Sequence, residues 1–91
     1  MSDVYRALAD PTRRRILGML RTGDMTAGDL ASRFDQAWPT ISGHLRVLRE
    51  ADLVQADRHG TSLVYHLNLS VLEEAMASLM TALRIGSKEA T

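Results

Sequence analysis

The chain has 91 residues, which is enough for one domain, and its 11 basic and 11 acidic side chains give zero net charge. Zero charge argues against a strongly basic nucleic-acid binder, although residues 11–60 carry eight arginines against six acids and so permit an anionic partner. The absence of cysteine excludes disulfides and thiolate metal sites. No apolar run approaches the roughly 20 residues that cross a membrane, and the first residues lack signal-peptide architecture, so we expect a cytoplasmic protein.

The first half of the chain predicts four helices, and three of them have a clear start signal. Asp10 followed by Pro11 is a capping residue and a first-position proline, which together begin the second helix. Thr26, with Asp29 three residues later, begins the third helix in the manner of a capping box. Pro39 opens the fourth helix. Apolar spacing extends these helices over about 3–9, 11–21, 26–34 and 39–51.

The next segment predicts a β-hairpin. Val54 begins a short strand, and residues 58–61 supply a turn. The alternation from Leu63 to Leu67 has the period of two that a half-buried strand requires, and it leaves His66 on the exposed side.

A fifth helix follows the hairpin. Ser70, with Glu73 three residues later, is expected to cap this helix, which continues to about residue 85. Gly86 is expected to end it. Residues 86–91 are expected to form a flexible tail.

Together these elements indicate a mainly α domain with a β-hairpin wing, a winged helix-turn-helix over residues 1–91. Residues 26–51 are expected to form the helix-turn-helix and residues 54–67 the wing. The first and last helices, 1–9 and 70–85, are expected to mediate dimerisation, because the apolar stripe of the last helix is wider than one small core needs. The alternative is that both helices only close the core of one monomer. The expected dimer residues are Val4, Tyr5, Leu8, Leu72, Met76, Leu79, Met80 and Leu83.

The helix that begins near Pro39 has an unusual outer face. Opposite its apolar stripe, the first two turns carry small or hydroxyl-bearing residues and a glycine, Gly43, which costs a helix interior about 1 kcal/mol relative to alanine. We interpret this bare position as a site where the helix closely approaches a surface, the alternative being a tolerated exposed substitution. Neither Ala37 nor Trp38 can cap through its side chain. The first-turn N–H groups are therefore expected to lack internal partners and to suit a phosphate; they belong to Thr40, Ile41 and Ser42.

Four segments resemble the ArsR-type winged-helix repressors of bacteria, and within them the branch of SdpR-like autorepressors: ALADPTRRRILGML, MTAGDLASRF, PTISGHLRVLREADLV and VYHLN. The resemblance covers about residues 4–83. It implies a homodimer that binds palindromic operator DNA, with 27–34 as the first helix of the helix-turn-helix and 39–51 as the recognition helix. The DNA-binding positions it implies are Trp38, Pro39, Thr40, Ser42, Gly43, His44 and Arg46, with Arg58 and His59 in the wing.

The sequence departs from the family pattern at three positions. The family usually has Arg or His where Gly43 stands and a hydroxyl cap where Ala37 stands, and it often has an apolar residue where Gln36 stands. Two roles stay open for Trp38: packing against a sugar or a thymine methyl group, or anchoring the turn against Phe34.

Metal chemistry and catalysis find little support in the sequence. One metal site of the family uses two cysteines at the start of the third helix, where this chain has Thr26 and Gly28. Another uses Asp and His on the last helix, where residues 70–85 have neither. We therefore expect no metal and no cofactor. No nucleophile elbow, catalytic triad or phosphate-binding glycine loop indicates an enzyme.

Individual basic residues have more local predictions. Arg13 lies beside the apolar stripe of its helix and is expected to form an ion pair with Asp10 or Asp29. Arg14 and Arg15 are expected to be solvated, the alternative being a contact with phosphate. His44 is expected either to contact DNA or to support the recognition helix.

The function favoured by these observations is a homodimeric, sequence-specific DNA-binding transcriptional regulator that represses its own or a neighbouring operon. One alternative is a winged-helix protein-interaction module with weakened DNA binding. Another is a ligand-responsive sensor without thiols, whose small-molecule inducer the sequence does not identify.

Overall fold

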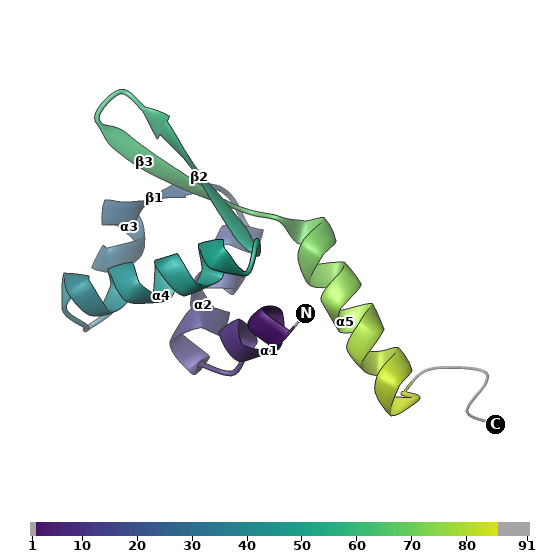
Figure 1. The fold of residues 1–91 in the computed structure, drawn as a ribbon. Coiled ribbons are helices and arrows are strands. Elements are labelled where there is room, and N and C mark those ends of the chain that lie inside the picture. Colours follow the sequence, from purple (N-terminus) through teal and green to yellow (C-terminus); the bar gives the residue numbers. More distant parts are fainter. Residues whose placement is uncertain (1, 86–91) are drawn as a thin grey trace.

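The structure is a computed structural model that describes residues 2–85. Its elements follow the predicted order and confirm the mainly helical winged helix-turn-helix fold (Figure 1). The predicted tail 86–91 and the predicted stop at Gly86 lie outside the described residues. The elements are α1 (Ser2–Leu8), α2 (Pro11–Arg21), β1 (Met25–Thr26), α3 (Ala27–Ser32), α4 (Trp38–Glu50), β2 (Val54–His59), β3 (Ser62–Leu67) and α5 (Leu69–Leu83).

Two of the three predicted caps are present. The Arg13 N–H donates to Asp10 Oδ2 at 3.1 Å at the start of α2, and the Asp29 N–H donates to Thr26 Oγ1 at 3.0 Å at the start of α3. These bonds satisfy donors that a helix start otherwise leaves free, so local sequence is sufficient to begin both helices.

The cap predicted at Ser70 is wrong, because α5 begins one residue before it and has Asn68 at the N-cap position. The Asn68 side chain does not cap the helix; its Nδ2 donates to the carbonyl of Asp52 at 2.8 Å. The Asn68 backbone N–H donates to the carbonyl of Leu53 at 2.9 Å. These two bonds tie the start of α5 to the turn between α4 and β2.

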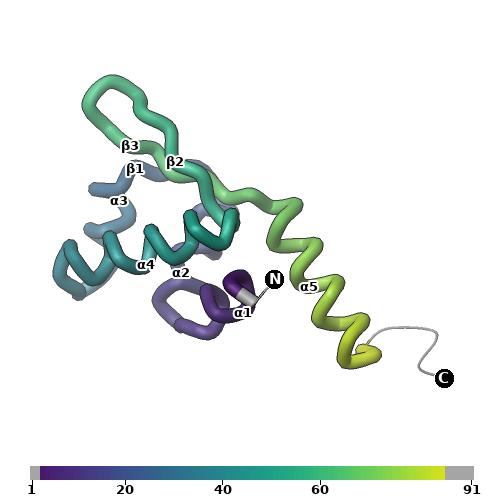
Figure 2. Tube along the Cα trace, viewed as in Figure 1, coloured from purple at the N-terminus to yellow at the C-terminus, as the bar shows by residue number. Residues whose placement is uncertain are grey.

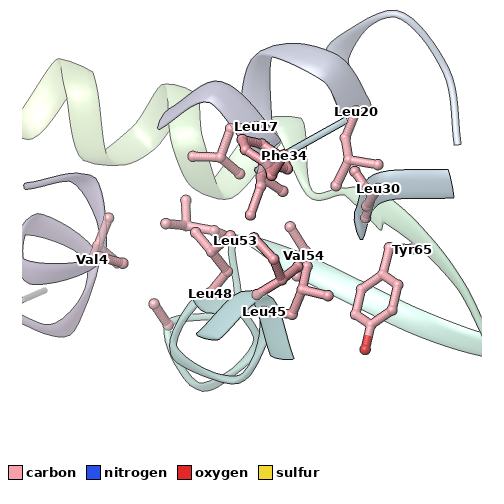
Figure 3. Close-up of a cluster of buried hydrophobic side chains, with 14 of the residues drawn as sticks. Val4, Leu17, Leu20, Leu30, Phe34, Leu45, Leu48, Leu53, Val54 and Tyr65 are labelled. Carbon is pink, nitrogen blue, oxygen red and sulfur yellow. The ribbon is translucent and has the colours of Figure 1, made fainter. Parts of the chain in front are cut away.

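The hydrophobic core gathers side chains from α1 to α4 and from the base of the wing. Figure 3 shows Leu17 and Phe34 facing Leu53 and Val54 across this core. Each fully buried aliphatic side chain contributes about 2 kcal/mol through removal from water. The largest fully buried side chains are Ile16, Leu30, Ile41, Leu45, Leu48, Leu53 and Val54.

The hairpin belongs to a three-stranded antiparallel sheet of order β1-β3-β2. β1 was not predicted, because two residues are too short to show a period. It pairs Thr26 with Val64 and so places the start of α3 beside the wing. β2 and β3 pair as far as His59 opposite Ser62, so the predicted turn over 58–61 is shorter than expected and comprises only two residues. Gly60, with φ +63°, adopts the left-handed conformation that such tight turns use.

The last helix extends away from the body of the domain (Figure 2). Its one fully buried residue is Ala75. The described part of the chain is accordingly elongated, measuring 52 × 24 × 21 Å. The large apolar side chains that α5 and its end expose are Leu69, Met76, Met80, Leu83 and Ile85.

Candidate nucleic-acid interface

On the outer face of α4, Pro39, Ser42 and Gly43 have small side chains or none. The opposite face of the helix carries the apolar stripe, which is buried. A shallow hollow of about 250 Å³ on the outer face is lined by Pro39, Ser42, Gly43 and Arg46. A Cβ built on Gly43 meets no atom within 4 Å, so packing inside the chain does not require glycine at this position. The missing side chain therefore leaves the helix backbone open to an external surface.

The start of α4 differs from the prediction. The N–H groups of Thr40 and Ile41 both donate to the carbonyl of Ala37, at 3.0 and 3.2 Å. The prediction that these two groups lack an internal partner is therefore wrong, because the chain turns tightly enough at Ala37 to supply its carbonyl to both. The Ala37 side chain makes no cap, as expected. Anion binding on this face must come mainly from side chains.

Trp38 occupies the first position of α4 and is 48% exposed. Phe34, its proposed anchoring partner, is buried in the core and lies under the Arg15 guanidinium, whose carbon is 4.6 Å from the ring centroid. Arg15 is exposed, as predicted, and its guanidinium also covers the Phe34 ring. The exposure of Trp38 favours an external contact over an anchoring role.

His44 points from α4 toward the junction of α1 and α2, and its side chain is 16% exposed. Its Nδ1 lies 3.2 Å from Arg13 Nη1, and its Nε2 lies 3.8 Å from Asp10 Oδ2. Because a guanidinium can only donate, Nδ1 accepts this hydrogen bond, which leaves Nε2 as the nitrogen that faces Asp10. These contacts favour the supporting role among the two left open for His44.

Arg13 makes none of the side-chain ion pairs predicted for it. Its Nε donates to the carbonyl of Ala7 at 2.8 Å, and its Nη2 donates to the carbonyl of Arg6 at 3.1 Å. Arg14 is exposed, as predicted, and it also donates to the carbonyl of Leu8 at 2.8 Å. Carbonyls at a helix end lack intrahelical partners and attract cations, and the accepting carbonyls lie in the last turn of α1, which ends at Leu8. Arg13 thus links α1, α2 and α4.

The carboxylate of Asp10 is held in its charged form by the same network. Burial raises the pKa of Asp10, but the hydrogen bond from the Arg13 N–H and the electrostatic attraction of the nearby His44 and Arg13 side chains together outweigh burial. The pKa of Asp10 therefore lies below its ordinary value of 3.8.

The two predicted wing residues lie on opposite faces of the hairpin. Arg58 pairs with Leu63, whereas His59 pairs with Ser62, and neighbouring strand residues alternate between faces. Arg58 therefore shares the face that carries Leu63 and the buried Tyr65. On the other face His66, predicted to be exposed, is half-buried.

His66 is paired on that outer face, where its Nε2 lies 2.9 Å from Asp57 Oδ2. Among residues 2–85, however, no three His, Asp or Glu side chains come close enough to hold a metal. Within the same range no helix is both long and apolar enough to span a bilayer.

A second hollow, of about 360 Å³, lies between the wing and the start of α3. The sequence did not indicate most of its residues, because only the unpredicted pairing of β1 with β3 brings them together. Its lining consists of Thr26, Ala27, Gly28, Arg58, Thr61, Ser62 and Leu63.

The residues predicted for dimerisation fall into three groups. Val4 is buried in the core of its own chain. Met76, Met80 and Leu83 are exposed by 41%, 42% and 59%. The other four, Tyr5, Leu8, Leu72 and Leu79, are half-buried. Three of these four line a groove of about 490 Å³ between α1 and α5, whose full lining is Tyr5, Leu8, Ala9, Arg14, Met76 and Leu79. The groove is lined mainly by apolar side chains and lies beside exposed methionines. Exposed apolar surface of this kind is often covered by another protein.

Comparisons with known proteins agree with this geometry. The family model described as "Bacterial regulatory protein, arsR family" matches residues 10–56. The chain is 39% identical over 89 residues to the transcriptional repressor SdpR of Bacillus subtilis (strain 168), an alignment covering 98% of this chain and 99% of that relative. It is 34% identical over 73 residues to the arsenical resistance operon repressor of Staphylococcus xylosus, covering 80% and 70%. A crystal structure of an ArsR family transcriptional regulator superposes with a TM-score of 0.83 at 28% identity, covering 92% of both chains.

Proposed function

Because the chain belongs to the ArsR family of bacterial regulatory proteins and is a DNA-binding transcriptional regulator rather than an enzyme, we propose that it is a homodimeric repressor acting at a palindromic operator. The relative that it matches over its whole length is named a transcriptional repressor, which supports repression. The operon it controls is its own or a neighbouring one.

The observation that carries this proposal is the bare outer face of α4. Gly43 has no packing role inside the chain, and the half-exposed Trp38 lies on the first turn. In the proposed complex, α4 enters the major groove with Gly43 against the DNA. Arg46 then reads a base edge, and Trp38 packs on a sugar or a thymine methyl group. The remaining proposed contacts are those of Pro39, Thr40 and Ser42 on α4 and of Arg58 and His59 in the wing.

In this proposal His44 does not contact DNA and instead helps to position the recognition helix α4. Its bond to Arg13 holds the middle of α4 against the end of α1. Since α1 also borders the groove that faces α5, this network joins the recognition helix to the proposed dimer surface.

The dimer is proposed from the apolar surface of α5. A helix that buries only Ala75 in its own chain leaves Met76, Met80 and Leu83 for a second copy. We expect a twofold axis through this surface to set two recognition helices about one DNA turn apart, roughly 34–36 Å.

The test is a fluorescence-anisotropy titration against the DNA upstream of the protein's own gene and against a shuffled duplex, at two salt concentrations. We expect selective binding that weakens as salt rises, because each phosphate contact releases counterions. Arg46→Ala should reduce selectivity about 10- to 100-fold. Arg21→Ala, a matched control at the exposed end of α2, should keep it. Equal affinity of the wild type for both duplexes would favour the protein-interaction module instead.

A further inference from the structure

The hollow between the wing and α3 is lined by one positively charged side chain, Arg58, and by three residues that carry hydroxyl groups, Thr26, Thr61 and Ser62. Within residues 2–85 the Arg58 guanidinium has no hydrogen-bonded or ion-paired partner. No carboxylate belongs to the lining. These polar groups are therefore available to a ligand.

The sheet register brings these groups together. Arg58 lies opposite Leu63, on the hairpin face that carries the buried Tyr65 nearer the base of the wing. α3 packs against β3 (Figure 1). The pairing of β1 with β3 sets Thr26 beside Val64. The hollow therefore forms where the apolar face of the wing gives way to polar side chains.

The groups that line the hollow suit an oxyanion. A guanidinium supplies charge and several N–H donors, and it binds phosphate oxygens more strongly than neutral groups do. Thr61 and Ser62 are exposed and can each donate one hydroxyl proton. The Thr26 oxygen already accepts the Asp29 N–H, so its own proton can be donated outward.

We propose that this hollow clamps one phosphate of the operator backbone in each half-site. The inference rests on the proposed function, because it places DNA along α4 and the wing. Arg58 supplies the charge, and the hydroxyls of Thr26, Thr61 and Ser62 supply directed hydrogen bonds. A phosphate held between wing and α3 fixes the angle at which α4 enters the groove, since both parts of the fold are then tied to one point of the DNA.

The experiment replaces each phosphate of a half-site in turn by an uncharged methylphosphonate and measures affinity by anisotropy. The affinity of the wild-type protein should fall about tenfold when the methylphosphonate stands at one particular position in each half-site, and much less at the others. Thr61→Ala/Ser62→Ala and Arg58→Gln should weaken binding to the native operator and become insensitive to that linkage. Arg21→Gln removes one positive charge elsewhere and should stay sensitive. Circular dichroism establishes that each variant is folded.

The outcomes separate the clamp from the proposed function. If the wild type binds selectively but the variants lose the same affinity as the wild type at every methylphosphonate position, the clamp alone is overturned. If the wild type is not selective, the proposed function fails, and the clamp is judged on the shuffled duplex. There Arg58→Gln should reduce the slope of log affinity against log salt by about one, and Arg21→Gln should not. Equal slopes overturn the clamp.

Free phosphate is the other source of the same chemistry. Inorganic phosphate is titrated while the amide signals of Thr61 and Ser62 are followed by NMR. We expect no saturable shift below about 10 mM, because a single exposed cation binds a small anion weakly in water. Saturation below that concentration, together with no sensitive linkage in DNA, assigns the hollow to a free anion and contradicts the clamp.

Discussion

Replacing Gly43 by alanine should change stability and DNA binding in opposite directions. Gly43 lies in the middle of α4 (Trp38–Glu50), and the added Cβ meets no atom within 4 Å. No steric cost therefore offsets the gain in helix propensity, which is about 1 kcal/mol per chain. For a domain of this size the melting temperature should rise by about 4–8 °C.

The same methyl group projects from the face that we place against DNA. It must separate the α4 backbone from the groove or displace a neighbouring contact, so operator affinity should fall about tenfold, comparable to one lost base contact. Thermal unfolding and anisotropy titration measure the two effects independently.

Gly18→Ala is the matched control. Gly18 lies in α2, is exposed, and its added Cβ also meets no atom within 4 Å. This variant should gain similar stability and keep wild-type DNA affinity. If Gly43→Ala were more stable and bound the operator as tightly as wild type, the glycine would only weaken the helix, and the reasoning about close approach would be refuted.

Three further changes test other parts of the structure. Met80→Glu should convert the dimer into a folded monomer by sedimentation equilibrium, because it places a charge on the exposed apolar face of α5; a persistent dimer places the interface elsewhere. Asp10→Asn should be less stable than wild type at pH 7, and this difference should shrink as pH falls below the ordinary aspartate pKa of 3.8. A carboxylate with a lowered pKa stabilises the fold above its unfolded pKa and loses that contribution as pH falls through the folded pKa; a stability difference independent of pH contradicts this. Arg13→Gln should lower the free energy of unfolding by about 1–3 kcal/mol in urea titrations, since it removes the charged hydrogen bonds from Arg13 to the carbonyls of Ala7 and Arg6; a loss no larger than that of Arg21→Gln argues against the network.

Local signals in the sequence were sufficient for most of the fold. Asp10 and Thr26 cap the helices that they were expected to cap, because each acts within three residues of itself. The start of α5 was misplaced because Asn68 is held by Asp52 and Leu53, which are distant in sequence. A two-residue strand such as β1 becomes a strand only through its partner, and no local pattern encodes that pairing.

The candidate site was predicted in part for the same reason. Helical periodicity alone places Gly43 and Arg46 on the outer face of α4. The partners of Arg13 depend on where α1 ends and on the approach of His44 from α4, so a helix wheel suggested the wrong ion pair. The hollow beside Arg58 depends on strand register, which a sequence read without pairing partners does not provide.

Hydroxyl-radical footprinting of the wild-type protein on its operator tests the proposed dimeric complex most directly. Two recognition helices related by a twofold axis should protect two symmetrical patches of backbone whose centres lie one helical turn, roughly 34–36 Å, apart. A single patch, or uniform protection along the fragment, would contradict a dimer that presents both α4 helices to one face of the DNA.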